Sequence, residues 1–278
     1  MRKALVAAVT AVLVAPTLAS AQDWRTVTMS RQIEDNDEVR VIVDYGAGRF
    51  NVTSTDDRVL YRMTLRYDED RFEPIADFSG DRLELGVESL GRRWNIGKGD
   101  NTGQLDLELA RGIPMDLELN FGAVRADLDL GGLALTDLAL RTGASESTVD
   151  MSEPNIAAMR RASFEAGAAE FTACNLGNLN AERIEVAVGV GDLTLGFSGR
   201  WEQDAAVSID MGLGALELRF PEGLGVRLRK KSFLTSLDSE GMVKRGDAYY
   251  SLDWDDADKK ITIDLDAAFG SVKVVWVR

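Results

Sequence analysis

The chain has 278 residues, with 46 Asp and Glu against 32 Lys and Arg, one Cys and no His. The missing histidine excludes Ser-His and Cys-His nucleophilic pairs and zinc sites built on imidazole. A single cysteine excludes an intrachain disulfide framework and an iron–sulfur cluster held by four thiolates. The net charge of −14 repels nucleic-acid phosphates and anionic lipid headgroups, so neither is an expected partner.

The N-terminus has the pattern of a secretory signal peptide, which we assign to residues 1–21. Arg2 and Lys3 form a positive n-region, an apolar run of about a dozen residues follows, and Ala-Ser-Ala at 19–21 supplies the small residues of a cleavage site. That run is shorter than the roughly 20 residues of a membrane span, which disfavours a retained anchor. The sequence predicts an exported protein, periplasmic or extracellular, whose mature chain 22–278 has a net charge of −16 after the loss of two positive charges.

The mature chain has the pattern of β-strand almost throughout. Apolar and polar residues alternate with the period of two that a half-buried strand produces. In each long strand the apolar phase shifts by one residue at a glycine, as where Val188 and Val190 precede Gly191 and Leu193 follows it. The same shift occurs at Gly48, at Gly122, at Gly214 after Leu213 and at Gly270 after Phe269, and with weaker apolar flanks at Gly143 and Gly167.

These glycines indicate corners in the backbone. A phase shift would turn the rest of the strand inside out unless the chain bends there, and glycine accepts the positive φ that a corner needs. From Gly122 to Gly214 the spacings are 21, 24, 24 and 23 residues, which is typical of stacked coils of a parallel β-solenoid. An antiparallel sandwich with evenly spaced strands is the alternative. The longer gaps, 48–122 and 214–270, predict degenerate coils or antiparallel caps.

Eight segments carry a family resemblance. They are RGIPMDLELNFGA at 111–123, ADLDLGGL at 126–133, LALRTGAS at 138–145, LGNLN at 176–180, VGVGDL at 188–193, GLGAL at 212–216, GDAYYS at 246–251 and FGSVKV at 269–274. On these motifs the chain, over roughly residues 105–278, resembles the toast-rack family of bacterial cell-envelope proteins. That family resembles the C-terminal domain of cell-wall-stress regulators and is described as adhesin-like. The resemblance implies an all-β, right-handed helix-like stack and attaches no catalytic residue to the motifs.

We predict an all-β fold, a right-handed parallel β-helix or solenoid-like stack with coils of about 21–24 residues. Residues 22–104 are expected to form an N-terminal β region with antiparallel pairing, continuous with the repeats of residues 105–278. Only residues 153–161 favour a short helix. Asp264 and Asp266 alternate with apolar residues near the C-terminus, which indicates a charged, protected edge strand.

Acidic side chains are the only residues of this sequence that could form a metal site or the active site of a glycosidase. Clusters lie at 35–38, 68–70 and 253–258, but none matches the twelve-residue calcium loop, so we interpret them as solvated loops, with calcium at 253–258 as the alternative. Asp127 and Asp129 project from one strand face about 6.5 Å apart at the backbone, which suits glycoside hydrolysis but is also typical of any solvent-facing strand. We therefore assign no catalytic, cofactor-binding or metal-binding residue.

The remaining polar candidates have structural interpretations. Asn175, Asn178 and Asn180 flank a turn, where their side chains can satisfy backbone groups. Cys174 has no basic neighbour in the sequence that would lower its thiol pKa, so a reactive thiol is not expected. The basic run at 227–231 alternates with apolar residues and is interpreted as the outward face of a strand.

The sequence favours a non-enzymatic, exported cell-envelope scaffold or interaction protein, adhesin-like or associated with a stress response. No cofactor is expected, and the expected partner is another envelope protein or a second copy of the chain. The alternative is a surface-carbohydrate-binding or carbohydrate-cleaving β-helix protein, which would place carboxylates beside exposed aromatic side chains on a surface glycan.

Export with cleavage after Ala21 can be tested by mass spectrometry. We expect the intact mass of the protein recovered from the cell envelope to correspond to a chain that starts at Gln22, because the small residues at 19–21 fit a cleavage site. Recovery of the full-length precursor as the stable form would contradict the prediction.

Overall fold

The computed structural model describes residues 23–90 and 103–278, so the predicted signal peptide lies outside the described residues. Within these residues the secondary structure is strand, apart from one 3₁₀ turn, η1 (Leu176–Leu179). The strands are β1 (Trp24–Gln32), β2 (Val39–Thr55), β3 (Val59–Asp68), β4 (Phe72–Ser79), β5 (Arg82–Ser89), β6 (Gln104–Ala110), β7 (Pro114–Asp129), β8 (Ala134–Asp150), β9 (Met159–Cys174), β10 (Ala181–Gly196), β11 (Ala205–Pro221), β12 (Gly225–Asp238), β13 (Met242–Arg245), β14 (Ala248–Ser251) and β15 (Lys260–Val277).

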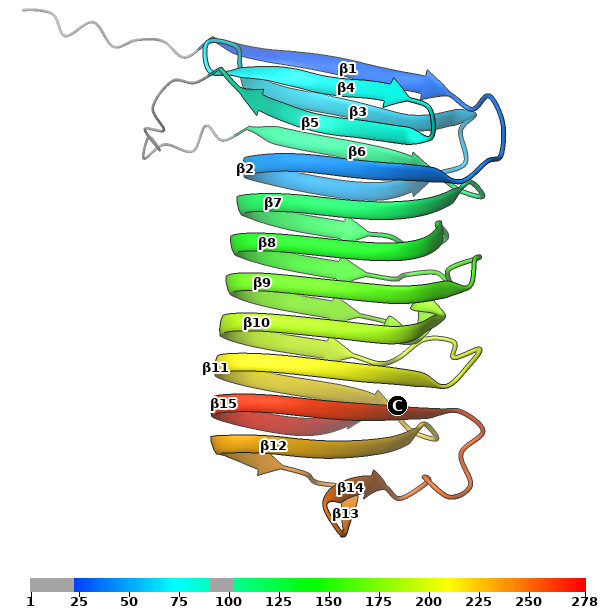
Figure 1. Ribbon diagram of the computed structural model, residues 1–278, viewed down its shortest axis with the longest axis vertical. Helices are drawn as coiled ribbons and strands as arrows, with labels where there is room; N and C mark the ends of the chain where they lie inside the picture. Colours follow the sequence, from blue (N-terminus) through cyan, green and yellow to red (C-terminus); the bar gives the residue numbers. More distant parts are fainter. Residues whose placement is uncertain (1–22, 91–102) are drawn as a thin grey trace, which may run out of the picture.

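The long strands stack in parallel into an elongated, two-layered solenoid, which confirms the predicted fold class. Each long strand turns back at the left edge of Figure 1, so its first half lies in one layer and its second half in the other. We call these layer A and layer B, the bend the corner edge, and the opposite side the loop edge. Neighbouring coils pair along both halves, as β10 does with β11 from Arg183–Ala206 to Gly196–Arg219.

The core is the space between the two layers. Inward side chains from successive coils lie in register, so Val186, Ile209 and Leu265 stack on one another, each no more than 2% exposed. Burying an aliphatic side chain of this size contributes about 1.5–3 kcal/mol relative to leaving it in water. The period-two alternation therefore supplies both layers with apolar side chains from a single strand.

Two ladders of small residues, two residues apart, form the corner edge. The first consists of Gly46, Gly122, Gly143, Gly167, Gly189 and Gly212, each facing the backbone of the one before. The second includes Gly191, Gly214 and Gly270, which are paired in register. The predicted equivalence of Gly167 and Gly191 is therefore wrong, because Gly191 pairs with Ala169. An offset of two residues preserves which side a residue faces, so the sequence spacing alone did not reveal it.

Positions 191 and 214 require glycine both because of their backbone conformation and because a side chain has no room there. Their φ angles are +143° and +150°, which side-chain-bearing residues rarely adopt. A Cβ on Gly191 would lie 1.8 Å from the carbonyl oxygen of Ala169, and one on Gly214 would lie 1.7 Å from that of Gly191. Gly143 differs, because it lacks a positive φ and its Cβ would meet its nearest atom, the carbonyl oxygen of Gly122, at 3.4 Å.

Antiparallel strands cap the N-terminal end, which confirms the predicted antiparallel pairing there and accounts for the gap 48–122. The first half of β2 pairs with β5 in layer A, and β5 pairs antiparallel with β4. The second half of β2 pairs with β6 in layer B, followed by β3 and then β1, both pairings being antiparallel. β2 also pairs in parallel with β7, so it is the first full coil of the stack.

At the other end the last strand in the sequence is not the last in the stack. β15 lies between β11 and β12 and is parallel to both, while β14 and β13 add an antiparallel hairpin to β12. The prediction of an edge strand at Asp264 and Asp266 is therefore wrong. Asp264 instead accepts a 2.6 Å hydrogen bond from Arg229 of β12, because outward charge suits an internal solvent-facing strand as well as an edge.

The corner geometry makes a stability prediction. Gly191→Ala and Gly214→Ala should each lower the free energy of unfolding by more than about 1 kcal/mol, since left-handed backbone alone costs about that much and the Cβ also collides with a carbonyl. Chemical denaturation measures the change, and Gly143→Ala is the matched control with a smaller expected loss. Equal denaturation midpoints for all three variants would contradict the prediction.

Candidate functional site

An exposed apolar ridge runs along the corner edge between the two ladders. Val190, Leu213, Phe269 and Leu234 occupy the same register position in β10, β11, β15 and β12. Their exposed fractions are 49%, 51%, 45% and 64%, although large apolar side chains in a folded chain are mostly covered. We call these four residues the corner ridge. A row of exposed apolar side chains on consecutive coils marks a contact surface more than scattered single ones would.

The sequence placed three ridge residues in the apolar phase of their strands, and the bend exposes them instead. Val190 lies between Gly189 and Gly191, and Leu213 between Gly212 and Gly214, so neither has a side chain next to it along its own strand. In the coils nearer the N-terminal end, the equivalent residues are alanines such as Ala168 and Ala144. The large apolar side chains are thus confined to the C-terminal half of the corner edge.

A shallow groove of about 580 Å³ lies beside the ridge on the outside of layer A. Its lining includes the carboxylates Glu165, Asp210 and Asp266 and a single cationic side chain, Arg141. These residues share one register row, in which Ala187 leaves a gap between Glu165 and Asp210. The groove is therefore acidic on the side away from the apolar ridge.

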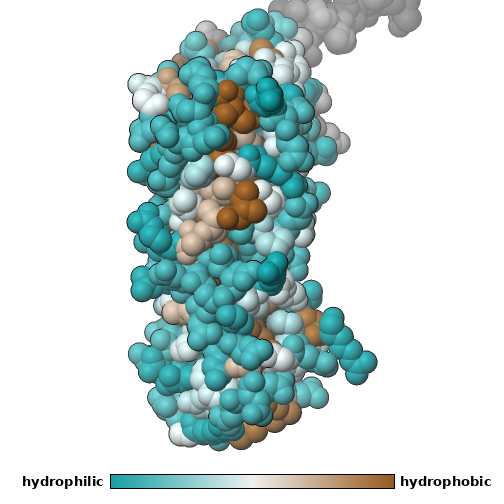
Figure 2. Space-filling view, turned by 90° about the vertical axis from the view of Figure 1, so that its right-hand side faces the viewer, coloured by the Kyte–Doolittle hydropathy of each residue, from teal (hydrophilic) through white to brown (hydrophobic). Residues whose placement is uncertain are grey.

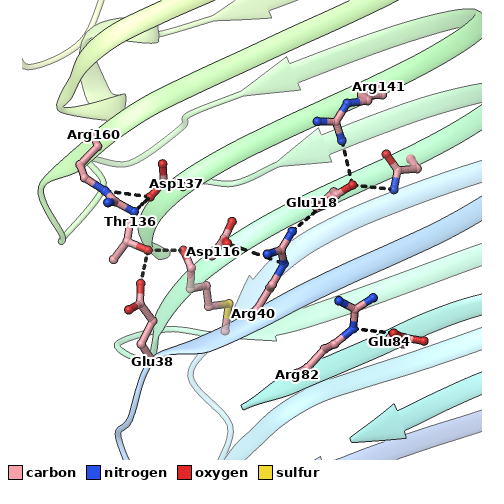
Figure 3. Close-up of polar contacts among 12 residues, drawn as sticks. Glu38, Arg40, Arg82, Glu84, Asp116, Glu118, Thr136, Asp137, Arg141 and Arg160 are labelled. Atoms are coloured by element: carbon pink, nitrogen blue, oxygen red, sulfur yellow. Dashed lines mark hydrogen bonds and ion pairs between the residues drawn. The ribbon is translucent and has the colours of Figure 1, made fainter. Parts of the chain in front are cut away.

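Nearer the N-terminal end, layer A carries a network of ion pairs (Figure 3). Glu118 of β7 accepts hydrogen bonds from Arg40 of β2 at 3.2 Å and from Arg141 of β8 at 2.8 Å. Asn120 donates to the same carboxylate at 3.2 Å. One row further from the corner, Arg160 donates to Asp137 at 2.5 Å. These contacts link four consecutive coils across the outer face.

The network shifts two carboxyl groups in opposite directions. Burial opposes the ionisation of Glu118, but the hydrogen bonds from Asn120 and Arg40 and the charge of Arg141 outweigh it and lower the pKa below its usual 4.5. Burial raises the pKa of Asp116 above its usual 3.8, with Arg40 opposing and neighbouring carboxylates reinforcing the rise. The charges at this face are thus arranged around Glu118.

The loop edge faces the viewer in Figure 2 and is largely hydrophilic, with apolar atoms in small patches. Ile156 and Leu252 lie in loops of this edge and are 63% and 70% exposed. They belong to separate loops, whereas the ridge residues are hydrogen-bonded neighbours in one sheet. Within the described residues the corner ridge is therefore the more continuous apolar surface.

Asp127 and Asp129 lie on the outward face of β7, as predicted, with Leu128 buried between them. Asp127 is exposed, whereas Asp129 forms hydrogen bonds at the loop edge. Ser152 donates its hydroxyl to Asp129 at 2.7 Å, and the amide of Gly131 donates at 3.0 Å. These contacts give Asp129 a structural role in joining two coils.

The acidic clusters do not converge on a metal site. Among the described residues no group of three or more His, Cys, Asp or Glu side chains could hold a metal ion. In the third cluster, Asp253 accepts the amide of Gly223 at 3.3 Å and Asp255 pairs with Arg245 at 3.0 Å. These carboxylates therefore face different partners.

The asparagines of the loop edge are structural, as predicted. Asn175 and Asn180 have positive φ angles of 55° and 52° on either side of η1, and Asn178 donates to the carbonyl of Met151 at 2.7 Å. The sequence missed Asn155, which is buried and bonds the amide and carbonyl of Leu135 and the carbonyls of two further residues. The suggested helix at 153–161 is wrong, because Asn155 holds that segment as a loop leading into β9.

Cys174 and the basic run also have structural surroundings. Burial, together with the charge of Asp150, raises the pKa of the Cys174 thiol, which keeps it protonated. In the basic run, Arg229 pairs with Asp264, and the ammonium of Lys230 donates to the carbonyl of Thr235. Arg227, Arg229 and Lys231 lie on the outward face of β12, as the alternation indicated, whereas Lys230 occupies the inward register position opposite buried Leu265.

Family comparison matches this architecture. The chain matches the family described as the N-terminal domain of toast_rack, DUF2154, over residues 20–173 and again over 163–219. The chain belongs to the toast-rack family. The match begins at residue 20, so the family extends further toward the N-terminus of this toast-rack protein than the motifs from residue 105 onward indicated.

Several solved structures are similar over most of the chain. A "putative cell adhesion protein" from Clostridium sporogenes is 16% identical with a TM-score of 0.49, covering 92% of this chain and 100% of its own. A "putative adhesin" from Bacteroides fragilis is 8% identical with a TM-score of 0.33, covering 90% and 97%. At these TM-scores neither likeness bears on the function of the toast-rack protein. A search of curated proteins finds no match. No helix among the described residues is long and apolar enough to cross a membrane.

The Glu118 network predicts a pH-dependent contribution to stability. Because the pKa of Glu118 is lowered in the folded state, its ionised form stabilises the fold above the usual pKa of 4.5, and this contribution is lost as the pH falls through the lowered value. Glu118→Gln should therefore cost about 1 kcal/mol near pH 7 and progressively less below pH 4.5. Denaturant midpoints measured across this range test it.

Asp116→Asn is the control for this titration. The pKa of Asp116 is raised, so the wild type should gain stability relative to this variant as the pH falls. A cost for Glu118→Gln that is constant between neutral and acidic pH would contradict the prediction.

Proposed function

We propose that this toast-rack protein is a non-enzymatic, exported cell-envelope protein that makes adhesin-like contacts with another macromolecule through the corner ridge. The observation that carries the proposal is the alignment of Val190, Leu213, Phe269 and Leu234, each about half exposed or more, on four consecutive coils. A straight apolar row on a stiff stack suits broad contact with an extended surface.

The groove beside the ridge indicates the chemistry of the partner. Its three carboxylates outnumber its one arginine, so basic side chains are favoured next to apolar ones on the partner surface. Another envelope protein with such a surface, or a second copy of this chain, is the proposed partner. Apolar contacts supply the affinity, and the charges favour one orientation of the partner.

The surroundings of the acidic residues favour a binding function over a catalytic one. Asp129, one of the two carboxylates that suit glycoside hydrolysis, is hydrogen-bonded to Ser152. On the outer face of layer A, Glu118 pairs with Arg40 and Arg141, and Asp137 pairs with Arg160. Engaged carboxylates are poorly placed to transfer protons to a substrate.

Crosslinking in cells tests the proposal. A photo-crosslinking residue at Thr194, which lies on the exterior of β10 beyond the corner, should capture one defined partner that mass spectrometry identifies. Leu213→Asp with Phe269→Asp should abolish this capture, because charge on the ridge opposes apolar burial. Ile156→Asp with Leu252→Asp, at comparably exposed sites of the loop edge, is the matched control and should leave it unchanged.

Both double variants should fold, since substitutions at exposed sites usually change stability by about 0.5 kcal/mol or less. Capture that survives the ridge variant would contradict the proposed surface. Cleavage of an envelope glycan that is lost in Asp127→Asn would contradict the non-enzymatic function.

A further inference from the structure

Both ends of the stack finish in strands whose outer edges are unpaired among the described residues. At the N-terminal end β1 pairs only with β3, and β4 only with β5. At the C-terminal end β13 pairs only with β14, and residues 234–238 of β12 pair only with β15. Free edges expose backbone donors and acceptors that another strand can satisfy.

The free edges of layer B run in the same direction. β1 is antiparallel to β3, β3 is antiparallel to β6, and β6 is parallel to the second half of β2, so β1 runs parallel to every second half in the stack. β1 contains no proline and no acidic residue. A second copy placed below β12 could therefore set its β1 alongside residues 234–238 as the next parallel strand.

The ends carry opposite charge in layer A. Residues 72–89, which form the β4–β5 hairpin, contain five carboxylates and one arginine. At the other end, residues 225–231 and 242–251, which form the layer A half of β12 together with β13 and β14, contain six Lys and Arg and one acidic residue, Asp247. Arg245 also pairs with Asp255 of the loop that follows β14. The outermost strands follow this division, with Glu73 and Asp77 on β4 and Lys244 and Arg245 on β13.

In layer B the arginines of the N-terminal end are already paired within one copy. Arg25 and Arg31 of β1 pair with Glu69 and Glu34 of the same copy, and the C-terminal edge carries Asp238 and Glu240. In layer A like ends therefore repel, whereas unlike ends attract. This pattern disfavours a symmetric dimer through equal ends and favours a head-to-tail contact.

We infer that copies of this protein associate end to end, with the β1 and β4 end of one copy against the β12 and β13 end of the next. Layer B contributes strand pairing, and layer A contributes ionic contact, because Pro74 interrupts the donors of β4. The contact also covers Val243 of β13, which is 44% exposed in the single chain. This surface is separate from the corner ridge and leaves the ridge open to a different partner.

Charge-swapped variants test the inference by sedimentation velocity. The wild-type chain should self-associate with rising concentration, and added salt should weaken the association because screening acts on exposed charges. Glu73→Lys with Asp77→Lys makes both outermost strands of layer A, β4 and β13, positive, and Lys244→Glu with Arg245→Glu makes both negative. Each variant alone should raise the dissociation constant at least about tenfold, and an equimolar mixture of the two should restore association.

Restoration in the mixture also shows that both variants are folded. Glu182→Lys with Asp192→Lys, two exposed carboxylates in the middle of the stack, is the control and should associate like the wild type. A wild type that stays monomeric at every concentration, or a mixture that fails to associate, would overturn the inference. A different outcome is that Leu213→Asp with Phe269→Asp abolishes association while the end variants retain it. That result would place the contact between copies on the corner ridge. It would overturn the inference and leave the proposed function intact.

Discussion

The close approach of backbones at the corner edge is the constraint on which the rest of the structure depends. At Gly214 a Cβ would lie 1.7 Å from the carbonyl oxygen of Gly191, the equivalent residue in the coil before it. Glycine therefore lets a single strand turn sharply and contribute to both layers. Because each strand serves both layers, one coil needs only about two dozen residues, and the apolar core between the layers is closed by the chain itself.

The same constraint creates the exposed ridge. A residue between two corner positions cannot point inward, because the backbone of the neighbouring coil fills that space. In the first coils this residue is alanine, whereas in the last four it is Val190, Leu213, Phe269 and Leu234. The fold would tolerate alanine throughout, so the large side chains on the later coils favour a contact role over a structural one.

Charge is distributed differently on the sides and at the ends of the stack. On the outer face of layer A, Glu118 and its arginine partners come from different coils, so their charges are satisfied within one molecule. At the ends, carboxylates on β4 and cations on β13 are too far apart to meet within a copy, because the whole stack separates them (Figure 1). The charges around Glu118 are thus balanced within one molecule, whereas the carboxylates of β4 can meet the cations of β13 only in another copy.

The sequence by itself determined the strands, the corners and the stacking, because alternation and glycine spacing follow from local backbone geometry. It also indicated the toast-rack family and the antiparallel N-terminal cap. Only the tertiary structure decided that Gly191 pairs with Ala169, that β15 lies inside the stack, and that Val190 is exposed. An offset of two residues leaves the alternation unchanged, and the pairing of distant strands depends on the packing of the whole chain. The corner ridge could not be predicted for the same reason. The period-two alternation shows that Val190 and Leu193 face different sides of the strand, but it does not show that the bend turns Val190 toward solvent.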